Sequence, residues 1–275
     1  MSAKRHVYFV SDRTGITAEV LGRTLLGQFP NIEFEKHTLP FIDTVARARE
    51  VVAQINDAAR PNGERPIVLT TLIDDDVRKT VAAVDALFLD LFEGFIKRLE
   101  AELAQESSHA LGLTHGRRDE LIYQQRMDAV NYTLTHDDGI NAQAYNKADL
   151  ILTGVSRTGK TPTCLYLAMQ YGVRAANYPL TPDDFDHLHL PGALPPFREK
   201  LFGLTISPER LSRIRHERRP NSRYAAIDTC RHELLAAEKL MRKEKIPVID
   251  TSSKSIEEIA ISILHATGLI DRVKL

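Results

Sequence analysis

The stretch Leu150-Ile151-Leu152-Thr153-Gly154-Val155-Ser156-Arg157-Thr158-Gly159-Lys160-Thr161 decides the fold of the second half of the chain. From Gly154 onward it matches the phosphate-binding pattern G-x-x-x-x-G-K-[ST] at every defined position. An apolar run comes directly before this loop, and a helical pattern with Leu165 and Leu167 comes directly after it. The motif requires this strand–loop–helix setting, so we expect a phosphate-binding loop (P-loop) on a parallel sheet.

Each part of the predicted P-loop has a physical task. The glycines let the backbone turn tightly, so that successive N–H groups point at phosphate oxygens. Lys160 would place a positive charge on the terminal phosphates, and the Thr161 hydroxyl would reach a magnesium ion. The helix that follows adds the positive end of its dipole. The candidate cofactor-binding residues are therefore Gly154, Val155, Ser156, Arg157, Thr158, Gly159, Lys160 and Thr161, with Thr161 also the candidate metal ligand. A Gly-rich turn without a ligand is the alternative.

The remaining sequence alternates β-rich runs with helical patterns, which indicates an α/β protein. We expect an N-terminal α/β domain over residues 1–140 and a C-terminal P-loop kinase-like domain with a mainly parallel sheet over residues 141–275. The expected strands are Val7–Val10, Ile32–Leu39, Ile67–Leu72, Leu150–Leu152, Val173–Asn177, Leu201–Ile206 and Ile246–Ile249. An amphipathic helix is expected over Phe88–Leu103, as core or as a subunit interface that admits a homodimer, and another helix over Tyr123–Leu134.

Composition excludes several classes of protein. The chain has 275 residues, a formal net charge of −1 and two cysteines. This charge supplies no general attraction to nucleic acid or to an anionic membrane, so neither is expected as a partner. Two cysteines argue against a disulfide framework. The start of the chain does not resemble a secretory signal. A cytoplasmic protein is therefore expected.

An arginine-rich segment follows the predicted strand Leu201–Ile206. Its members are Arg210, Arg213, Arg215, Arg218, Arg219 and Arg223. Phosphoryl-transfer enzymes often close such a lid over the reacting phosphates. The alternative is a solvated helix paired with Glu209 and Glu217. Asp250 ends the last predicted strand, where it would orient a metal ion or, equally, belong to a helix N-cap with Thr251 or Ser252.

Two further loops carry groups that could act in chemistry. His136-Asp137-Asp138-Gly139 packs an imidazole and two carboxylates into one turn. A carboxylate there could take the proton from an attacking hydroxyl or hold magnesium, so His136, Asp137 and Asp138 join Lys160 as candidate catalytic residues. An ordinary Asp-Gly turn is the alternative. The loop Ser11–Gly15 could hold an anion between a strand and a helix, or Asp12 or Thr14 could simply cap that helix.

These stretches together resemble one protein family. The resemblance rests on the stretches Val10–Glu19, His136–Gly139, Gly154–Pro162, Arg174–Pro179 and Leu201–Ile206. It extends from about Val7 to about Leu269 and is to the regulatory proteins of pyruvate, phosphate dikinase and phosphoenolpyruvate synthase. Tyr166-Leu167-Ala168-Met169 is most similar to the branch that acts on phosphoenolpyruvate synthase. Arg13 departs from the pattern, which has a small residue before Thr14.

The resemblance implies two opposed reactions on phosphoenolpyruvate synthase as the protein partner. One is an ADP-dependent kinase that phosphorylates a threonine near the catalytic histidine of the synthase and inactivates it. The other removes that phosphate with inorganic phosphate and releases pyrophosphate. Both need an anion held beside a protein hydroxyl, so one cradle at Gly154–Thr161 could serve both, with ADP, inorganic phosphate and Mg²⁺ as ligands.

Two other functions remain open from the residues alone. The first is a P-loop kinase with the same fold that transfers phosphate from ATP to a small molecule instead of a protein. The second is a nucleotide-sensing protein, which would bind a nucleotide at the P-loop and catalyse no reaction. Turnover of ATP or ADP, with and without the synthase, separates the three.

Overall fold

The computed structural model describes residues 4–58, 63–108, 117–185 and 189–273. Contacts within the chain divide it into two compact units, unit 1 over residues 1–114 and unit 2 over residues 115–275. The division comes earlier than the expected 140/141 boundary. The intervening helix and the turn at His136–Gly139 therefore belong with the P-loop unit.

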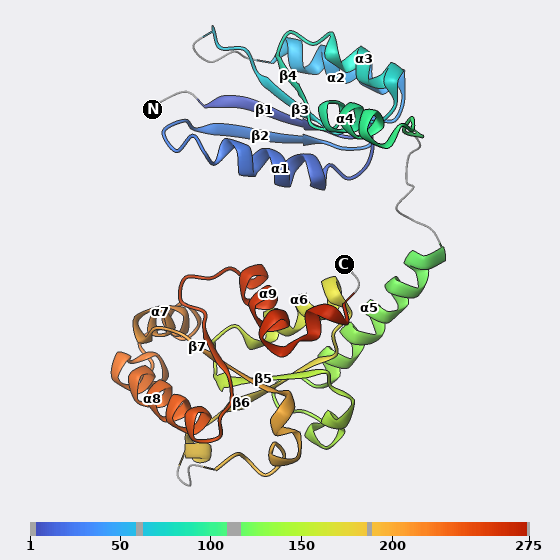
Figure 1. The fold of residues 1–275 in the computed structure, drawn as a ribbon. Coiled ribbons are helices and arrows are strands. Elements are labelled where there is room, and N and C mark those ends of the chain that lie inside the picture. Colours follow the sequence, from blue (N-terminus) through green and yellow to red (C-terminus); the bar gives the residue numbers. More distant parts are fainter. Residues whose placement is uncertain (1–3, 59–62, 109–116, 186–188, 274–275) are drawn as a thin grey trace. The chain divides into compact units, whose positions relative to one another are not determined.

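Unit 1 is a four-stranded parallel sheet in the order β2-β1-β3-β4 (Figure 1). Its strands and helices alternate along the chain, as the sequence pattern predicts. In chain order they are β1 (Arg5–Val10), α1 (Ile16–Leu26), β2 (Phe34–Leu39), α2 (Val45–Asp57), β3 (Ile67–Thr70), α3 (Asp75–Ala82), β4 (Leu87–Asp90) and α4 (Glu93–Leu103).

Alternate residues of β1 supply the two faces of the unit 1 core. Tyr8 and Val10 pack with residues of α2 and α3, such as Val51. Val7 and Phe9 pack on the opposite face with residues of α1. The central strands are therefore buried on both sides, as a parallel sheet requires.

The predicted helix over Phe88–Leu103 is wrong in its first part. Leu87–Asp90 forms β4, which pairs in parallel with β3. Asp90 then ends the strand and accepts hydrogen bonds from the backbone N–H groups of Phe92 and Glu93, at 2.8 Å each, at the start of α4. Most of the apolar stripe of α4 does not enter the core of unit 1, because Phe95, Leu99 and Leu103 are exposed.

Unit 2 contains a second four-stranded parallel sheet, in the order β6-β5-β7-β8. Short 3₁₀ turns such as Ala142–Lys147 connect some of its elements. In chain order the strands and longer helices are α5 (Arg117–Thr135), β5 (Leu150–Val155), α6 (Lys160–Tyr171), β6 (Ala175–Leu180), β7 (Leu201–Thr205), α7 (Pro208–Arg218), α8 (Ile227–Lys243), β8 (Val248–Asp250) and α9 (Ile256–Thr267).

Two apolar clusters cover the two faces of this sheet. Leu150 and Leu152 of β5 pack with side chains of α6 and α9. Ile151 and Val155 face the other way and pack with side chains of α8, among others. The strand that leads into the P-loop is thus buried along its length, which holds the loop at the carboxyl edge of the sheet.

Several predicted boundaries shift in unit 2. The strand expected over Val173–Asn177 begins later and runs through Pro179, as β6, and the last expected strand begins at Val248, as β8. The helix expected over Tyr123–Leu134 is confirmed and is longer, as α5. Among the residues that the structure describes, no helix has the length and apolar character needed to cross a membrane.

Candidate functional site

The predicted P-loop links β5 to α6, as its sequence requires. Gly154 has a φ of 141°, and a Cβ atom there would lie 2.3 Å from the carbonyl oxygen of Leu204 on the neighbouring strand. Gly159 has a φ of 95° and precedes the first residue of α6. Both positions therefore require glycine. A side chain at position 154 would clash with the neighbouring strand, and an L residue at position 159 would have a strained backbone. Arg157 also has a positive φ, of 79°.

Lys160 is folded back onto its own loop. Its Nζ donates a hydrogen bond of 2.9 Å to the carbonyl oxygen of Val155, and the residue is only 5% exposed. Burial lowers the pKa of this ammonium group to about 8, against the opposing influence of Asp138 and Asp137. Thr158 donates to the same carbonyl oxygen, at 3.1 Å. The loop thus closes on itself with a buried cation at its centre.

A polar cluster of Asp137, Thr161 and Asn177 joins the turn before β5 to the start of α6. Thr161 Oγ1 donates to Asp137 Oδ1 at 2.9 Å. The side-chain amide of Asn177 donates to the same Asp137 oxygen and to Thr161 Oγ1. A hydroxyl and a carboxylate oxygen are hard ligands of the kind that Mg²⁺ prefers. Thr161 and Asp137 therefore fit a magnesium ion at this position.

Asn177 was not among the site residues expected from the sequence. It is 1% exposed on β6, and its Oδ1 accepts a hydrogen bond of 3.2 Å from the backbone N–H of Asp138. Its carbonyl oxygen accepts from the backbone N–H of Gly139 at 3.0 Å. An amide side chain within the buried strand run Ala175–Asn177 was the available signal, because buried polar groups need partners.

Asp138 differs from Asp137 in its environment. Asp138 is exposed, has a left-handed backbone with a φ of 50°, and its carboxylate makes no hydrogen bond among the described residues. It still acts electrostatically on Lys160 and raises the pKa of that ammonium group, against burial. One carboxylate of the turn is thus tied to the loop, and the other is free to meet a substrate.

His136 is buried beneath the turn. Its ring stacks on Tyr132 with the centroids 3.9 Å apart, and Nδ1 lies 2.8 Å from the Tyr132 carbonyl oxygen. A carbonyl only accepts, so Nδ1 is the protonated nitrogen in this contact. Nε2 is buried without a hydrogen-bond partner among the described residues. This geometry favours a positioning role for His136 beneath the His136–Gly139 turn, rather than direct contact with a substrate.

Arg215 is the buried member of the arginine-rich segment. It is 0% exposed, and its guanidinium donates to the Ser156 carbonyl oxygen at 3.1 Å and to Glu233 at 2.7 Å. It also lies over the ring of Tyr224, 4.1 Å from the centroid. Tyr224 in turn donates to Ser156 Oγ at 2.9 Å. Arg215 therefore anchors the P-loop to α7 and α8.

The other arginines of the segment have different environments. Arg210 donates to the carbonyl oxygen of Ser252. In the alternative of a solvated helix, these arginines pair with Glu209 and Glu217, but Glu209 pairs with Arg231 of α8, at 3.2 Å. The exposed arginines without an ion pair among the described residues are Arg213, Arg218, Arg219 and Arg223.

Asp250 forms a local turn at the end of β8. Its Oδ1 accepts from the backbone N–H of Ser252 at 2.8 Å and from the Ser252 hydroxyl. The cap of α9 is Ser255, in a capping box with Glu258, so the N-cap expected at Thr251 or Ser252 is wrong. The carboxylate beside Thr161 is Asp137, not Asp250.

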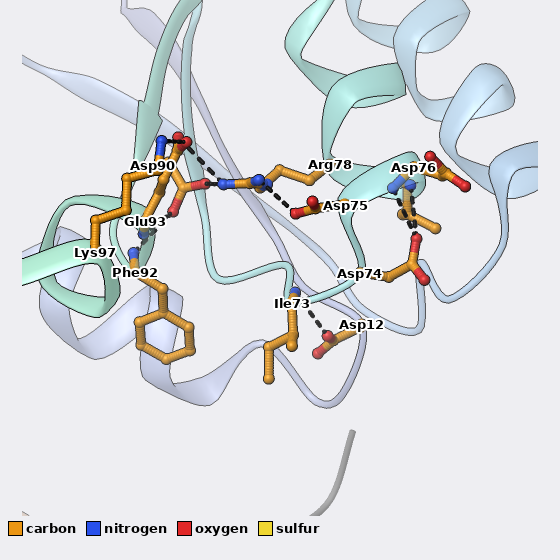
Figure 2. Close-up of polar contacts among 11 residues, drawn as sticks. Asp12, Ile73, Asp74, Asp75, Asp76, Arg78, Asp90, Phe92, Glu93 and Lys97 are labelled. Atoms are coloured by element: carbon orange, nitrogen blue, oxygen red, sulfur yellow. Dashed lines mark hydrogen bonds and ion pairs between the residues drawn. The ribbon is translucent and has the colours of Figure 1, made fainter. Parts of the chain in front are cut away.

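The loop Ser11–Gly15 of unit 1 is tied to the segment after β3, as Figure 2 shows for Asp12. The Asp12 carboxylate accepts from the backbone N–H of Ile73 at 3.2 Å, and burial raises its pKa above the usual range. Gly15 occupies the N-cap position of α1 and no side chain caps it. The expected capping by Asp12 or Thr14 is therefore wrong. Nearby, Arg78 is neutralised by Asp75, Asp90 and Glu93.

A cavity of about 510 Å³ in unit 2 lies away from the P-loop. Its lining includes Asp149 and Arg174, which precede β5 and β6, so it opens at the opposite edge of the sheet. These two side chains pair with each other at 3.3 Å. The cavity is therefore separate from the phosphate site.

Comparison with known proteins agrees with the resemblance seen in the sequence. The model of the kinase/pyrophosphorylase family matches residues 7–264. A relative from Azoarcus sp. strain BH72 is 54% identical over 266 residues, covering 96% of both chains. One from Neisseria meningitidis strain FAM18 is 51% identical over 269 residues, covering 98% of both. Each is named as a candidate phosphoenolpyruvate synthase regulatory protein. The chain is therefore an enzyme of the kinase/pyrophosphorylase family.

Proposed function

We propose that this protein regulates phosphoenolpyruvate synthase in the cytoplasm, through ADP-dependent phosphorylation of a threonine and phosphate-dependent removal of that phosphate. The observation that carries the proposal is the cluster of Thr161, Asp137 and Asn177 beside the buried Lys160. It combines an anion cradle, a cation and a carboxylate–hydroxyl pair at one end of a parallel sheet. The names of the relatives support the choice of protein substrate.

In the kinase direction, the P-loop would hold ADP with its β-phosphate at Lys160. Asp138 would accept the proton of the target threonine hydroxyl, because its carboxylate is exposed and has no hydrogen bond among the described residues. The threonine oxygen forms a bond to the β-phosphorus, and the bond from that phosphorus to the bridging oxygen breaks and releases AMP. Mg²⁺ at Thr161 and Asp137 would neutralise charge on the phosphates.

In the opposite direction, inorganic phosphate would occupy the same cradle. Its oxygen attacks the phosphorus of the phosphothreonine, and the bond from phosphorus to the threonine oxygen breaks. Asp138 takes the proton of the attacking phosphate and passes it to the threonine oxygen, and pyrophosphate leaves. Lys160 stabilises the charge on the transferred group in both directions.

The test is transfer of label from ADP to the synthase. The protein is incubated with purified phosphoenolpyruvate synthase, Mg²⁺ and ADP labelled in its β-phosphate, and the labelled residue is mapped. Label on a threonine, and its later release as pyrophosphate when inorganic phosphate is added, would support the proposal. Lys160→Ala should lower the rate at least about tenfold, and Lys254→Ala, an exposed lysine of unit 2, should leave it unchanged.

The same assay rejects the proposal in two recognisable ways. Transfer from ATP to a small molecule without the synthase would indicate a small-molecule kinase. Nucleotide binding without any transfer would indicate a sensor.

A further inference from the structure

Three side chains with metal-binding atoms meet on the first two strands of unit 1. Parallel pairing sets His6 of β1 beside Glu35 of β2, and Tyr8 beside His37. Residues two apart on a strand share a face of the sheet. His6, Glu35, His37 and Tyr8 therefore form one block on a single face, far along the sequence from the P-loop.

The distances within this block are close to those of a metal site. His6 Nδ1 lies 3.1 Å from His37 Nε2. The Glu35 carboxylate lies 3.7 Å from His6 Nδ1 and 3.8 Å from His37 Nε2. Two ligand atoms of a tetrahedral zinc ion with bonds of about 2.0–2.1 Å are themselves roughly 3.3 Å apart. Small side-chain rotations would bring all three atoms to that spacing.

The surroundings hold the two imidazoles and leave one side open. Buried Tyr8 stacks on the His37 ring with the centroids 4.9 Å apart. The His6 side chain is 15% exposed and that of Glu35 is 51% exposed, so water can reach the site as a fourth ligand. Within the described part of the chain, no lysine or arginine forms an ion pair with Glu35, and its only ionic contacts are the two histidines.

We propose that His6 Nδ1, His37 Nε2 and the Glu35 carboxylate bind a divalent transition-metal ion of the zinc class. Imidazole nitrogens with one carboxylate suit Zn²⁺ and its neighbours, whereas Mg²⁺ requires oxygen ligands. The ion would link the central strand β1 to the edge strand β2 and so stabilise unit 1 against unfolding. This site is independent of the phosphate cradle in unit 2.

The competing interpretation is a metal-free hydrogen bond between the two histidines. A separation of 3.1 Å also fits an N–H donor on one ring and a bare nitrogen on the other. That arrangement needs no ion and gives no reason for Glu35 to lie beside both rings. Direct metal titration separates the two interpretations.

The experiment uses the full chain without a histidine tag, stripped of metal with a chelator. Zn²⁺ is titrated by calorimetry and by competition with a chromophoric chelator, with Mg²⁺ in excess as a competitor. The wild type should bind one equivalent that Mg²⁺ does not displace. His37→Gln and Glu35→Gln should each weaken this binding at least about tenfold. His265→Gln, at an exposed histidine of α9, should retain it.

Thermal melting supplies a second readout. Excess Zn²⁺ should raise the melting temperature of the wild type and of His265→Gln, and leave that of His37→Gln unchanged. Melting of the metal-free variants checks that they fold. If His37→Gln does not fold, Glu35→Gln takes its place in this test. Absence of a stoichiometric Zn²⁺ site, or equal binding by the wild type and the folded variants, would overturn the proposal.

Discussion

At the residue scale, Lys160 combines a structural contact with the charge that the proposed mechanism uses. It is nearly fully buried against the Val155 carbonyl oxygen, which replaces part of the hydration that its ammonium group loses. Burial also brings its pKa down to about 8. The charge that the P-loop needs is therefore present at neutral pH and lost in mildly alkaline solution.

We predict that ADP affinity weakens as the pH rises above about 8. The protonated lysine binds phosphate, and bound phosphate raises the pKa of the ammonium group. Binding above pH 8 must therefore take up a proton, and affinity should fall by up to about tenfold per pH unit. Calorimetry in two buffers of different ionisation enthalpy measures this uptake directly.

Lys160→Arg provides the matched control for this titration. Arginine keeps its charge throughout the range, so its ADP affinity should be nearly independent of pH, even if weaker. Proton uptake near zero for the wild type at about pH 9 would contradict a lysine with a pKa of about 8.

The two carboxylates of the His136–Gly139 turn should behave differently when changed. Asp137→Asn removes the charge beside Thr161, so we expect a higher Mg²⁺ requirement and weaker binding of Mg·ADP. Asp138→Asn should lower kcat by about a hundredfold or more, with little change in ADP affinity. Asparagine tolerates the left-handed backbone at position 138, so the fold should be kept.

Mg²⁺ titrations of activity, ADP binding and thermal melting check this distinction. Both variants should melt within a few degrees of the wild type. If both melt several degrees lower and keep normal specific activity, the turn is structural and neither carboxylate acts in the chemistry.

At the scale of elements, Arg215 connects α7 and α8 to the P-loop. Arg215→Met would leave Glu233 without its partner and the Ser156 carbonyl oxygen without a donor. Breaking a buried pair in this way typically costs about 3–5 kcal/mol. We therefore expect a lower stability of unit 2 and weaker ADP binding, because the loop loses its anchor.

Urea unfolding and hydrogen exchange of the α7 and α8 amides measure this effect. Arg213→Ala, on the same helix but exposed and without an ion pair among the described residues, should change stability by less than about 0.5 kcal/mol. Replacing both Arg215 and Glu233 by apolar residues should recover part of the loss. A double variant as unstable as the sum of the single ones would argue against a coupled pair.

At the scale of the whole molecule, the question is whether the two opposed reactions share one site. In the proposed mechanism the threonine phosphate has one position, reached in line either by leaving AMP or by incoming phosphate. We predict that inorganic phosphate competes with ADP and that Lys160→Ala impairs both directions at least about tenfold. Both rates are measured on the same variant with phosphoenolpyruvate synthase.

A second anion site in unit 1, at the Ser11–Gly15 loop, would give a different result. Lys160→Ala would then abolish the kinase and spare the phosphorylase, while Asp12→Asn would impair only the phosphorylase. That pattern would exclude the shared cradle.

Local patterns were sufficient for the P-loop and the class of fold. The loop is contiguous from Gly154 to Thr161, and both of its glycines have the positive φ that the motif requires. The alternation of strands and helices follows from the spacing of apolar residues, which recur every two residues in a strand and every 3.6 in a helix. This spacing is visible within a short stretch of sequence. Only the first part of the run Phe88–Leu103 is a strand and not a helix, because a short apolar run fits either state and the pairing of β4 with β3 decides it.

The sequence by itself therefore determined the phosphate cradle, the parallel α/β architecture and the family resemblance. Only the tertiary structure decided which distant groups complete the site. Thr161 meets Asp137 from 24 residues away, and Arg215 reaches Ser156 from 59 residues away. The same holds for His6 and His37, which the register of two strands brings together. Such contacts depend on which elements become neighbours in the packed fold, and the local periodicity of apolar residues does not carry that information.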